Sequence, residues 1–546
     1  MMRLNFWTVV SILTWLMLLL FLFVPVGSVL ISSLYDDAGG ITTKNYHALF
    51  IDPRFHRAFI NTLIVGFGGL AGALVLGSVM AFCVSRFVIA GAPFVSLLAI
   101  LALVSPPFIG AYSWIVLFGA GGIVRQTLMD YGIVIPPIYG LSGILIVFSL
   151  KFYPYVYLMV SGALSNVNRS LEEAAEGLGL TPWQRVWSIS FPMVFPALTA
   201  GGLLAFIHAI ADFGTPRLLG RGFNVLATEA FTLYSAEIGS NLSMATTISV
   251  VLIVVSMIFV GLQRYISRRN VYHSSMINKP IKIQLRGWRN VLALVTVYGI
   301  GMLGAIPIIV AVVFSLRKTN GPVFQVGIGF QSYERLLFNL RDIIVNSLTF
   351  SATTVALIVI VGSVVGVLVA RRTSLNTSLL DGSFMIPYVM PGIVIGIAYV
   401  SAFNTGPLIL TGTATIIILS VFIRRLPYSV RTTAAALRQI SPSMEEAAVS
   451  LGYSPLRAFL KITIPLIAPG VIAGGMLSFV TAINELSSSL VLYVGSTMTI
   501  PVRIYLLILD GDFGTAAAMS TLLLLISGSA VYIAFRLMGR NEQTLL

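Results

Sequence analysis

The chain has 546 residues, of which 57% are hydrophobic and only 10% are charged, against roughly 25% charged residues in an ordinary soluble domain. This composition excludes a soluble globular protein and indicates a protein that spans the membrane. The formal net charge of +14 comes from basic residues gathered in short segments between apolar runs. Such residues anchor the cytoplasmic face of membrane proteins, so nucleic-acid binding is not expected.

Apolar stretches long enough to cross a bilayer as helices recur along the whole chain. Twelve spans are predicted, near residues 7–31, 59–84, 93–118, 140–163, 188–210, 244–263, 290–314, 343–370, 380–403, 408–428, 463–483 and 515–537. The longest polar interruption follows the sixth span, contains many basic residues and has no acidic residue. We therefore predict a first repeat at 1–263, a basic cytoplasmic linker at 264–289 and a second repeat at 290–546. The positive-inside rule then places both termini in the cytoplasm.

The second half of the chain repeats the first at a constant offset of 273 residues. The matching segments are Lys151–Tyr155 with Arg424–Tyr428, Leu171–Ala175 with Met444–Ala448, and Asp212 with Glu485. The first half also has extra residues, expected in an outward loop from Gly119 to Gly140. The pattern predicts an all-α polytopic membrane protein of about twelve helices in two tandem six-helix repeats. Because six is an even number, the repeats share one orientation, and a pathway is expected between them.

Each repeat carries one copy of a motif between its fourth and fifth spans, on the predicted cytoplasmic side. The motif reads Glu-Ala-Ala, then a glycine four residues after the second alanine, and later Ile-x-apolar-Pro. The glycine can end a short helix at positive φ, and a proline shortly after it favours the first turn of a second helix. The predicted features are N-caps at Asn168, Ser170 or Ser441, short helices at 171–178 and 444–451, stops at Gly179 and Gly452, and helix starts at Pro182 and Pro455.

These segments resemble the EAA loops of inner-membrane permease subunits of binding-protein-dependent ABC importers. A chain with two such loops is similar to the fused permeases of the ferric-iron group. The resemblance implies a type I, MetI-like permease in a bacterial inner membrane, with two copies of a cytoplasmic ABC ATPase docked on the loops and a periplasmic binding protein that delivers substrate. ATP and Mg would be bound by the ATPase, and no cofactor by this chain.

The resemblance also assigns roles to residues of both loops. Those implied to dock the ATPase are Glu172, Glu173, Ala174, Ala175, Gly179, Glu445, Glu446, Ala447, Ala448 and Gly452. Those implied to form the hinge between loop and span are Ile189, Pro192, Ile462 and Pro465. The segments 214–241 and 487–513 would contribute to the periplasmic gate.

The sequence lacks the common motifs of nucleotide binding, catalysis and metal binding. None of the six lysines follows a glycine, so the chain has no Gly-Lys-Ser/Thr phosphate loop, and any ATPase must be another chain. There is no His-Glu-x-x-His, no Gly-x-Ser-x-Gly and no Cys/His cluster with metal-ligand spacing. The only cysteine is Cys83. We expect neither an enzyme active site nor a metal site.

Ionisable residues within or beside the predicted spans are candidates for the substrate pathway, because charge inside a membrane is costly and often functional. Lys151 and Arg424 lie at equivalent positions, where they either line a path for an anionic substrate or chelated ferric ion, or pair structurally with an acidic residue of a neighbouring span. Asp212 and Glu485 end the fifth spans, and His208 lies one helical turn before Asp212. A gate-lining or structural role is favoured over metal binding, since Thr481 replaces His208 in the second repeat.

The predicted function is therefore that of the permease subunit of an ATP-driven importer, with ferric iron as substrate. Alternatives within the same machinery are a phosphonate, a sugar phosphate, thiamine or another small anion. A proton-coupled secondary transporter, using Asp212 or Glu485, is the alternative of another class. A membrane enzyme would require clustered catalytic side chains that the sequence lacks.

Overall fold

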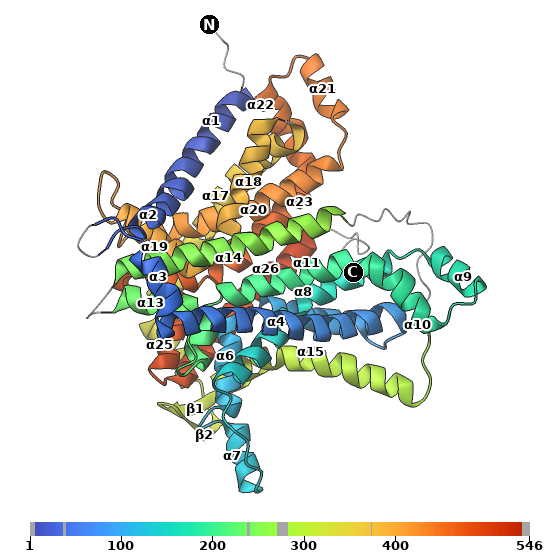
Figure 1. The fold of residues 1–546 in the computed structure, drawn as a ribbon, viewed down its shortest axis with the longest axis vertical. Coiled ribbons are helices and arrows are strands. Elements are labelled where there is room, and N and C mark those ends of the chain that lie inside the picture. The colour runs from blue at the N-terminus through green and yellow to red at the C-terminus, as the bar shows by residue number, and fades with distance from the viewer. Residues whose placement is uncertain (1–5, 37–39, 237–240, 270–281, 373, 538–546) are drawn as a thin grey trace. The chain divides into compact units, whose positions relative to one another are not determined.

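The computed structural model describes residues 6–36, 40–236, 241–269, 282–372 and 374–537, and this part of the chain is almost wholly helical (Figure 1). Both termini, predicted to be cytoplasmic, and residues 270–281 of the predicted linker lie outside the described residues.

The chain forms two compact units that are not continuous in sequence. Unit 1 comprises residues 1–47, 230–253 and 315–546, and unit 2 comprises residues 48–229 and 254–314. Each unit therefore contains most of one repeat together with the first span of the other repeat. The boundaries fall within α3 (Lys44–Ile51), α13 (Leu226–Ser235) and α14 (Leu242–Arg269), and before the last residue of α15 (Trp288–Ser315).

Unit 2 is organised around helices α4, α8 and α11, which pack against one another. A Cβ atom on Gly72 of α4 would clash with Ser149 of α8, and a Cβ atom on Gly77 of α4 would clash with the backbone of α8. Small residues thus allow the two backbones to approach closely, as is typical of helices packed within membranes. The helices of this unit are α4 (Pro53–Arg86), α5 (Ala92–Val104), α6 (Pro107–Phe118), α7 (Ile123–Asp130), α8 (Leu141–Ser165), α9 (Arg169–Gly177), α10 (Pro182–Arg185), η2 (Val186–Ser190), α11 (Phe191–Ala211), α12 (Gly214–Leu219) and α15 (Trp288–Ser315).

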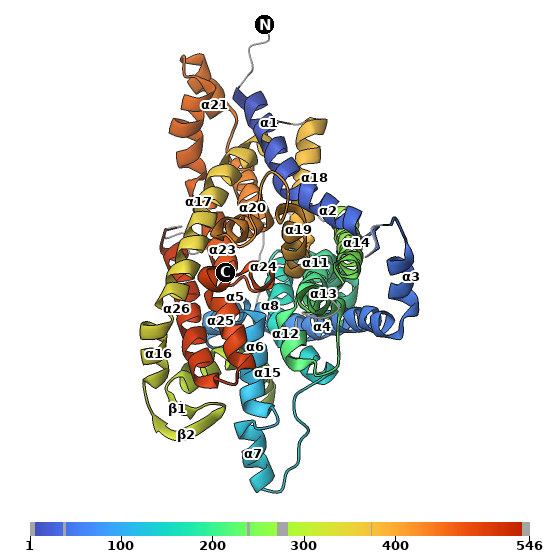
Figure 2. The same ribbon diagram turned by 90° about the vertical axis from the view of Figure 1, so that its left-hand side faces the viewer.

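Unit 1 has the corresponding centre, built from α17, α20 and α23. Gly362 and Gly366 of α17 face Ser429 and Thr433 of α20, where any Cβ would clash. The elements of this unit are α1 (Phe6–Leu18), η1 (Leu19–Phe23), α2 (Val24–Ser32), β1 (Arg317–Asn320), β2 (Val323–Ile328), α16 (Gln331–Asn339), α17 (Arg341–Arg371), α18 (Leu375–Val389), α19 (Gly392–Phe403), α20 (Ala414–Arg438), α21 (Ser443–Ser450), α22 (Pro455–Ala458), η3 (Phe459–Thr463), α23 (Ile464–Ile483), α24 (Ser487–Leu492), η4 (Gly495–Thr497), α25 (Ile500–Leu509) and α26 (Phe513–Leu537). The antiparallel hairpin β1–β2 lies beside α16 and α26 (Figure 2).

Three five-residue π-helical segments, η1, η2 and η3, each end two residues before a proline. A proline lacks the N–H that would bond the carbonyl four residues earlier, and its ring crowds that carbonyl, so a widened turn accommodates it. In η1, the carbonyl of Phe21 lies four residues before Pro25. The Tyr399 hydroxyl of α19 donates a hydrogen bond to this carbonyl at 2.8 Å, a partner that Pro25 cannot provide because it has no N–H.

The structure divides some of the predicted spans differently from the sequence pattern. Among the described residues, ten helices are long and apolar enough to cross a membrane, or eleven if one bent pair is counted as a span. The prediction of a single helix at 93–118 is wrong, because Pro106 separates α5 from α6. The predicted span at 380–403 is the bent pair, α18 and α19, which meet at Pro391 with a bend of 106°. The span predicted at 408–428 begins later, at Ala414, and α20 continues to Arg438, so it carries several arginines.

Candidate functional site: two EAA loops and a buried ion-pair cluster

The first EAA loop has the predicted helix–turn–helix form. The Asn168 side chain accepts a hydrogen bond from the backbone N–H of Ser170 at 3.0 Å and caps α9, so Asn168 is the N-cap. Gly179 has φ of +82°, and the N–H of Leu180 donates to the Ala175 carbonyl at 3.0 Å, which closes the C-terminal turn. Thr181 then caps the next helix with a complete capping box.

The second loop repeats this geometry. Helix α21 ends before Gly452, which has φ of +90°, and the N–H of Tyr453 donates to the Ala448 carbonyl at 3.1 Å. Its N-terminus differs from the prediction, because Pro442 occupies the N-cap position while the Ser441 hydroxyl accepts a hydrogen bond from the Ser443 N–H at 3.3 Å. Both glycine stops are confirmed.

The two alanines of each motif face in different directions. Ala174 and Ala447 are exposed, whereas Ala175 and Ala448 are each only 6% exposed. The second alanine of each motif is therefore buried in the described structure, and its predicted docking role stays a prediction. Glu173 and Glu446 are exposed on the same helices, and nothing is described of the Glu445 side chain.

Glu172 is engaged within the chain. Its carboxylate accepts hydrogen bonds from both terminal nitrogens of Arg86, one of them at 2.8 Å, and from the Ser190 hydroxyl at 3.1 Å. Arg86 is 8% exposed and ends α4, and Ser190 is the last residue of η2. The predicted docking role of Glu172 stays a prediction, but the structure gives this side chain an internal partner.

The predicted hinge residues coincide with the π-helical turns η2 and η3. Ile189 lies in η2 and Ile462 in η3, and the N–H of the residue after each segment donates to a carbonyl five residues earlier. Pro192 and Pro465 follow in the first turn of α11 and α23. An irregular turn therefore separates loop from span at the same place in both repeats.

Lys151 caps a broken helix. Its ammonium group donates to the carbonyls of Ala102 and Leu103 at 2.7 and 2.8 Å, and to that of Ser105, where α5 ends at the break before Pro106. A cation at a helix C-terminus is favourable, and these carbonyls have no partner within the helix. Of the two roles considered for Lys151, the geometry favours the structural one.

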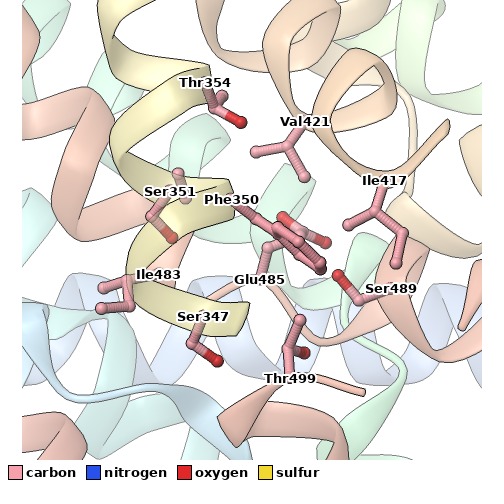
Figure 3. Close-up of a pocket in the computed structure, with 11 residues that line it drawn as sticks. Ser347, Phe350, Ser351, Thr354, Ile417, Val421, Ile483, Glu485, Ser489 and Thr499 are labelled. Atoms are coloured by element: carbon pink, nitrogen blue, oxygen red, sulfur yellow. The ribbon is translucent and has the colours of Figure 1, made fainter. Parts of the chain in front are cut away.

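Arg424 forms an ion pair with an acidic residue of the chain, Glu485, which is the structural one of the two roles predicted for it. Its Nη1 donates to both carboxylate oxygens of Glu485 at 2.7 Å, and Nη2 of the neighbouring Arg425 donates to Oε2 at 2.6 Å. The Glu485 side chain is only 4% exposed, and it also accepts the Ser488 N–H at the start of α24. A small cavity borders this carboxylate, lined by the hydroxyl residues Ser347, Ser351, Thr354, Ser489 and Thr499 (Figure 3).

Asp212 has the equivalent position in the first repeat and a simpler role. Its carboxylate accepts the Thr215 N–H at 3.1 Å and caps α12. His208 does not share a metal-type cluster with it: its Nδ1 contacts the Leu204 carbonyl at 2.8 Å and its ring stacks on Tyr155. No group of three or more His, Cys, Asp or Glu residues that could hold a metal ion occurs in the part of the chain that the structure describes.

Three features of these clusters were not predicted from the sequence: the involvement of Arg86, the involvement of Ser190, and the pairing of Arg425 with Glu485. A usable signal was present, since both α4 and α17 end in an arginine, and Ser190 is matched by Thr463 at the repeat offset. What the sequence could not supply was the partner of each arginine.

The chain matches a known protein family. The sequence profile of the family described as "Binding-protein-dependent transport system inner membrane component" matches residues 64–272 and 359–541, once in each repeat and over more than half of the chain. The chain belongs to this family. The tandem duplication and the permease fold expected from the motif are thereby confirmed.

Several individual permeases align with this one. It is 28% identical to the ferric transport system permease protein FbpB of Actinobacillus pleuropneumoniae over 538 residues, covering 95% of this chain and 76% of that protein. It is also 28% identical to the putative ferric transport system permease protein FbpB 1 of Haemophilus influenzae over 509 residues, covering 90% and 78%. The putative 2-aminoethylphosphonate transport system permease protein PhnU of Salmonella typhimurium is 28% identical over 267 residues, covering 47% of this chain and 93% of that protein.

Proposed function

We propose that this permease is the membrane subunit of an ATP-driven importer that takes ferric iron from a periplasmic binding protein into the cytoplasm. The observation that carries the substrate is the alignment with two permeases named for ferric transport along at least 90% of this chain. A phosphonate is the second candidate, since the relative named for 2-aminoethylphosphonate aligns with about half of the chain.

Energy would come from two copies of a cytoplasmic ATPase, one docked on each EAA loop. Each loop exposes a glutamate followed by a small alanine: Glu173 and Ala174 in the first loop, and Glu446 and Ala447 in the second. This repeated surface supports the proposal of two equivalent docking sites. ATP and Mg would be held by the ATPase, while this chain catalyses no bond chemistry. Both termini would then lie in the cytoplasm, on the side of the loops.

Docking would move α9 and α21, and the rigid turns at Gly179 and Gly452 would pass that movement to the following helices. Helix α11 begins within two turns of α10, with no flexible connection, and α23 follows α22 in the same way. Proton coupling through Asp212 or Glu485 is not needed in this mechanism, and both carboxylates have structural partners.

The test is co-purification and transport in proteoliposomes with the ATPase and binding protein of the same host. Glu173→Lys/Glu446→Lys should lower ATPase binding by about tenfold or more, because a reversed charge at an interface weakens association strongly. Glu334→Lys is the matched control, an exposed glutamate of α16 outside both loops. Uptake of radioactive iron from the loaded binding protein, but not of 2-aminoethylphosphonate, is expected. Unchanged ATPase binding in the double variant would refute the docking assignment.

A further inference from the structure

A partly buried ionic cluster at the first EAA loop is formed by Arg86, Glu172 and Ser190. The guanidinium group of Arg86 pairs with both oxygens of Glu172, and its Nη2 also donates to the Ser190 hydroxyl at 2.9 Å. The Ser190 hydroxyl in turn donates to Glu172 at 3.1 Å. Each of the three side chains thus contacts the other two.

The cluster joins three segments that are far apart in sequence. Arg86 ends α4, Glu172 lies in the first turn of α9, and Ser190 closes the π-helical turn η2. The side chain of Arg86 is 10% exposed and that of Glu172 is 23% exposed. A bidentate arginine–carboxylate pair with this degree of burial fixes both distance and orientation, so α9 cannot move without displacing the end of α4 or breaking the pair.

The backbone beside Arg86 extends this connection. The carbonyl of Arg86 accepts a hydrogen bond from the Ile283 N–H at 2.8 Å, and the Val88 N–H donates to the Ile283 carbonyl at 3.1 Å. Ile283 belongs to the segment that leads from the first repeat into the second. The end of α4 is therefore held both by the loop and by this connecting segment.

The second repeat has the same residue types at the corresponding places. Arg371 lies in the last turn of α17, Glu445 matches Glu172, and Thr463 supplies a hydroxyl where the first repeat has Ser190. Arg371 donates to the carbonyl of Ile440, just after α20, at 3.0 Å. The recurrence of an arginine, a glutamate and a hydroxyl in two copies of the repeat indicates a role tied to the loop itself.

We propose that Arg86 and Glu172 are positioning residues that couple movement of the first EAA loop to helix α4. The Glu172 carboxylate is engaged by Arg86 and Ser190 and does not touch the ATPase, in contrast with exposed Glu173. The proposal rests on the proposed import function and adds to it a route by which force reaches the second span, beside the direct route through η2 into the fifth span.

The test separates docking from coupling in proteoliposomes that contain the full permease, its ATPase and its iron-loaded binding protein. Glu172→Gln and Arg86→Gln should retain two bound ATPases, whereas the number of iron ions imported per ATP hydrolysed should fall by about tenfold, within the range typical of coupling between sites. The charge-swapped double variant Arg86→Glu/Glu172→Arg should recover much of the wild-type number of iron ions imported per ATP. Arg86→Lys keeps the charge but loses the bidentate geometry, so an intermediate ratio is expected and the test does not depend on one variant folding.

Glu176→Gln is the matched control. Glu176 lies on the same helix and pairs with Arg185 at 2.7 Å, but its side chain is 66% exposed, so import per ATP should stay at the wild-type value. Wild-type coupling in Glu172→Gln would overturn the positioning role and leave the proposed function intact. Loss of ATPase binding in that variant would also overturn it, since Glu172 would then be a docking contact. A wild-type permease that binds no ATPase would overturn both.

Discussion

The cluster around Glu485 allows a sharp test, because the first repeat provides its own control. Replacing Glu485 with Gln keeps the shape of the side chain but removes the only carboxylate that faces Arg424 and Arg425 within hydrogen-bond distance in the described structure. Two guanidinium groups, with side chains 11% and 15% exposed, would then remain without a counter-charge. One glutamate balances two arginines here, so its loss affects both.

The expected destabilisation is about 3–5 kcal/mol, which is typical when one partner of a buried ion pair is removed. Asp212→Asn in the first repeat should cost about 0.5 kcal/mol or less, because asparagine caps a helix about as well as aspartate. Among the described residues, Asp212 has no basic nitrogen within 4 Å, and its carboxylate accepts the Thr215 N–H at 3.1 Å at the start of α12. The predicted difference between the two variants is therefore about 2.5 kcal/mol or more.

The measurement is unfolding of the purified permease in mixed micelles by titration with a denaturing detergent, followed by tryptophan fluorescence. Adding Arg425→Gln to Glu485→Gln should restore at least about 1 kcal/mol, since it removes one unbalanced buried charge. Equal destabilisation by Glu485→Gln and Asp212→Asn would refute the reasoning. It would mean that helix capping, and not the ion pair, accounts for the importance of this position.

Two further predictions concern the loop and the broken helix. Gly179→Ala should destabilise the first loop by about 1 kcal/mol, because the residue has positive φ although a Cβ would meet no atom within 4 Å. Faster hydrogen exchange in α9 would show this effect, whereas Gly177→Ala, at the last residue of α9, should slow exchange. Lys151→Met should cost about 1–3 kcal/mol by leaving the carbonyls at the end of α5 unpaired, and exposed Lys44→Met should be neutral in the same detergent titration. Reduced iron import with unchanged stability in Lys151→Met would instead indicate a lining role.

Much of the architecture was predictable because it depends on local or periodic features of the chain. The apolar runs, the repeat at constant offset and the helix–turn–helix form of the loops follow from residue types at fixed spacing. Gly179 and Gly452 adopt positive φ where expected, and Thr181 caps the helix that begins at Pro182. These features are set by the backbone preferences of single residues and of their near neighbours.

The breaks in the spans were harder to foresee. Pro106 and Pro391 divide predicted spans into separate helices, while Pro154 and Pro427 lie inside continuous ones. A proline removes one backbone hydrogen bond in every case, but the packing of neighbouring helices decides whether the helix ends or continues.

The sequence by itself therefore determined that this protein lies in the membrane, that it is duplicated, and that each copy presents a stiff loop with a Glu-Ala-Ala helix. Only the tertiary structure decided which side chains of that motif face outward and which are engaged inside. Glu172 meets Arg86 across 86 positions, and Arg424 meets Glu485 across 61. Pairings over such distances leave no periodic trace along the chain, because they depend on how the helices pack, and packing is a property of the whole fold.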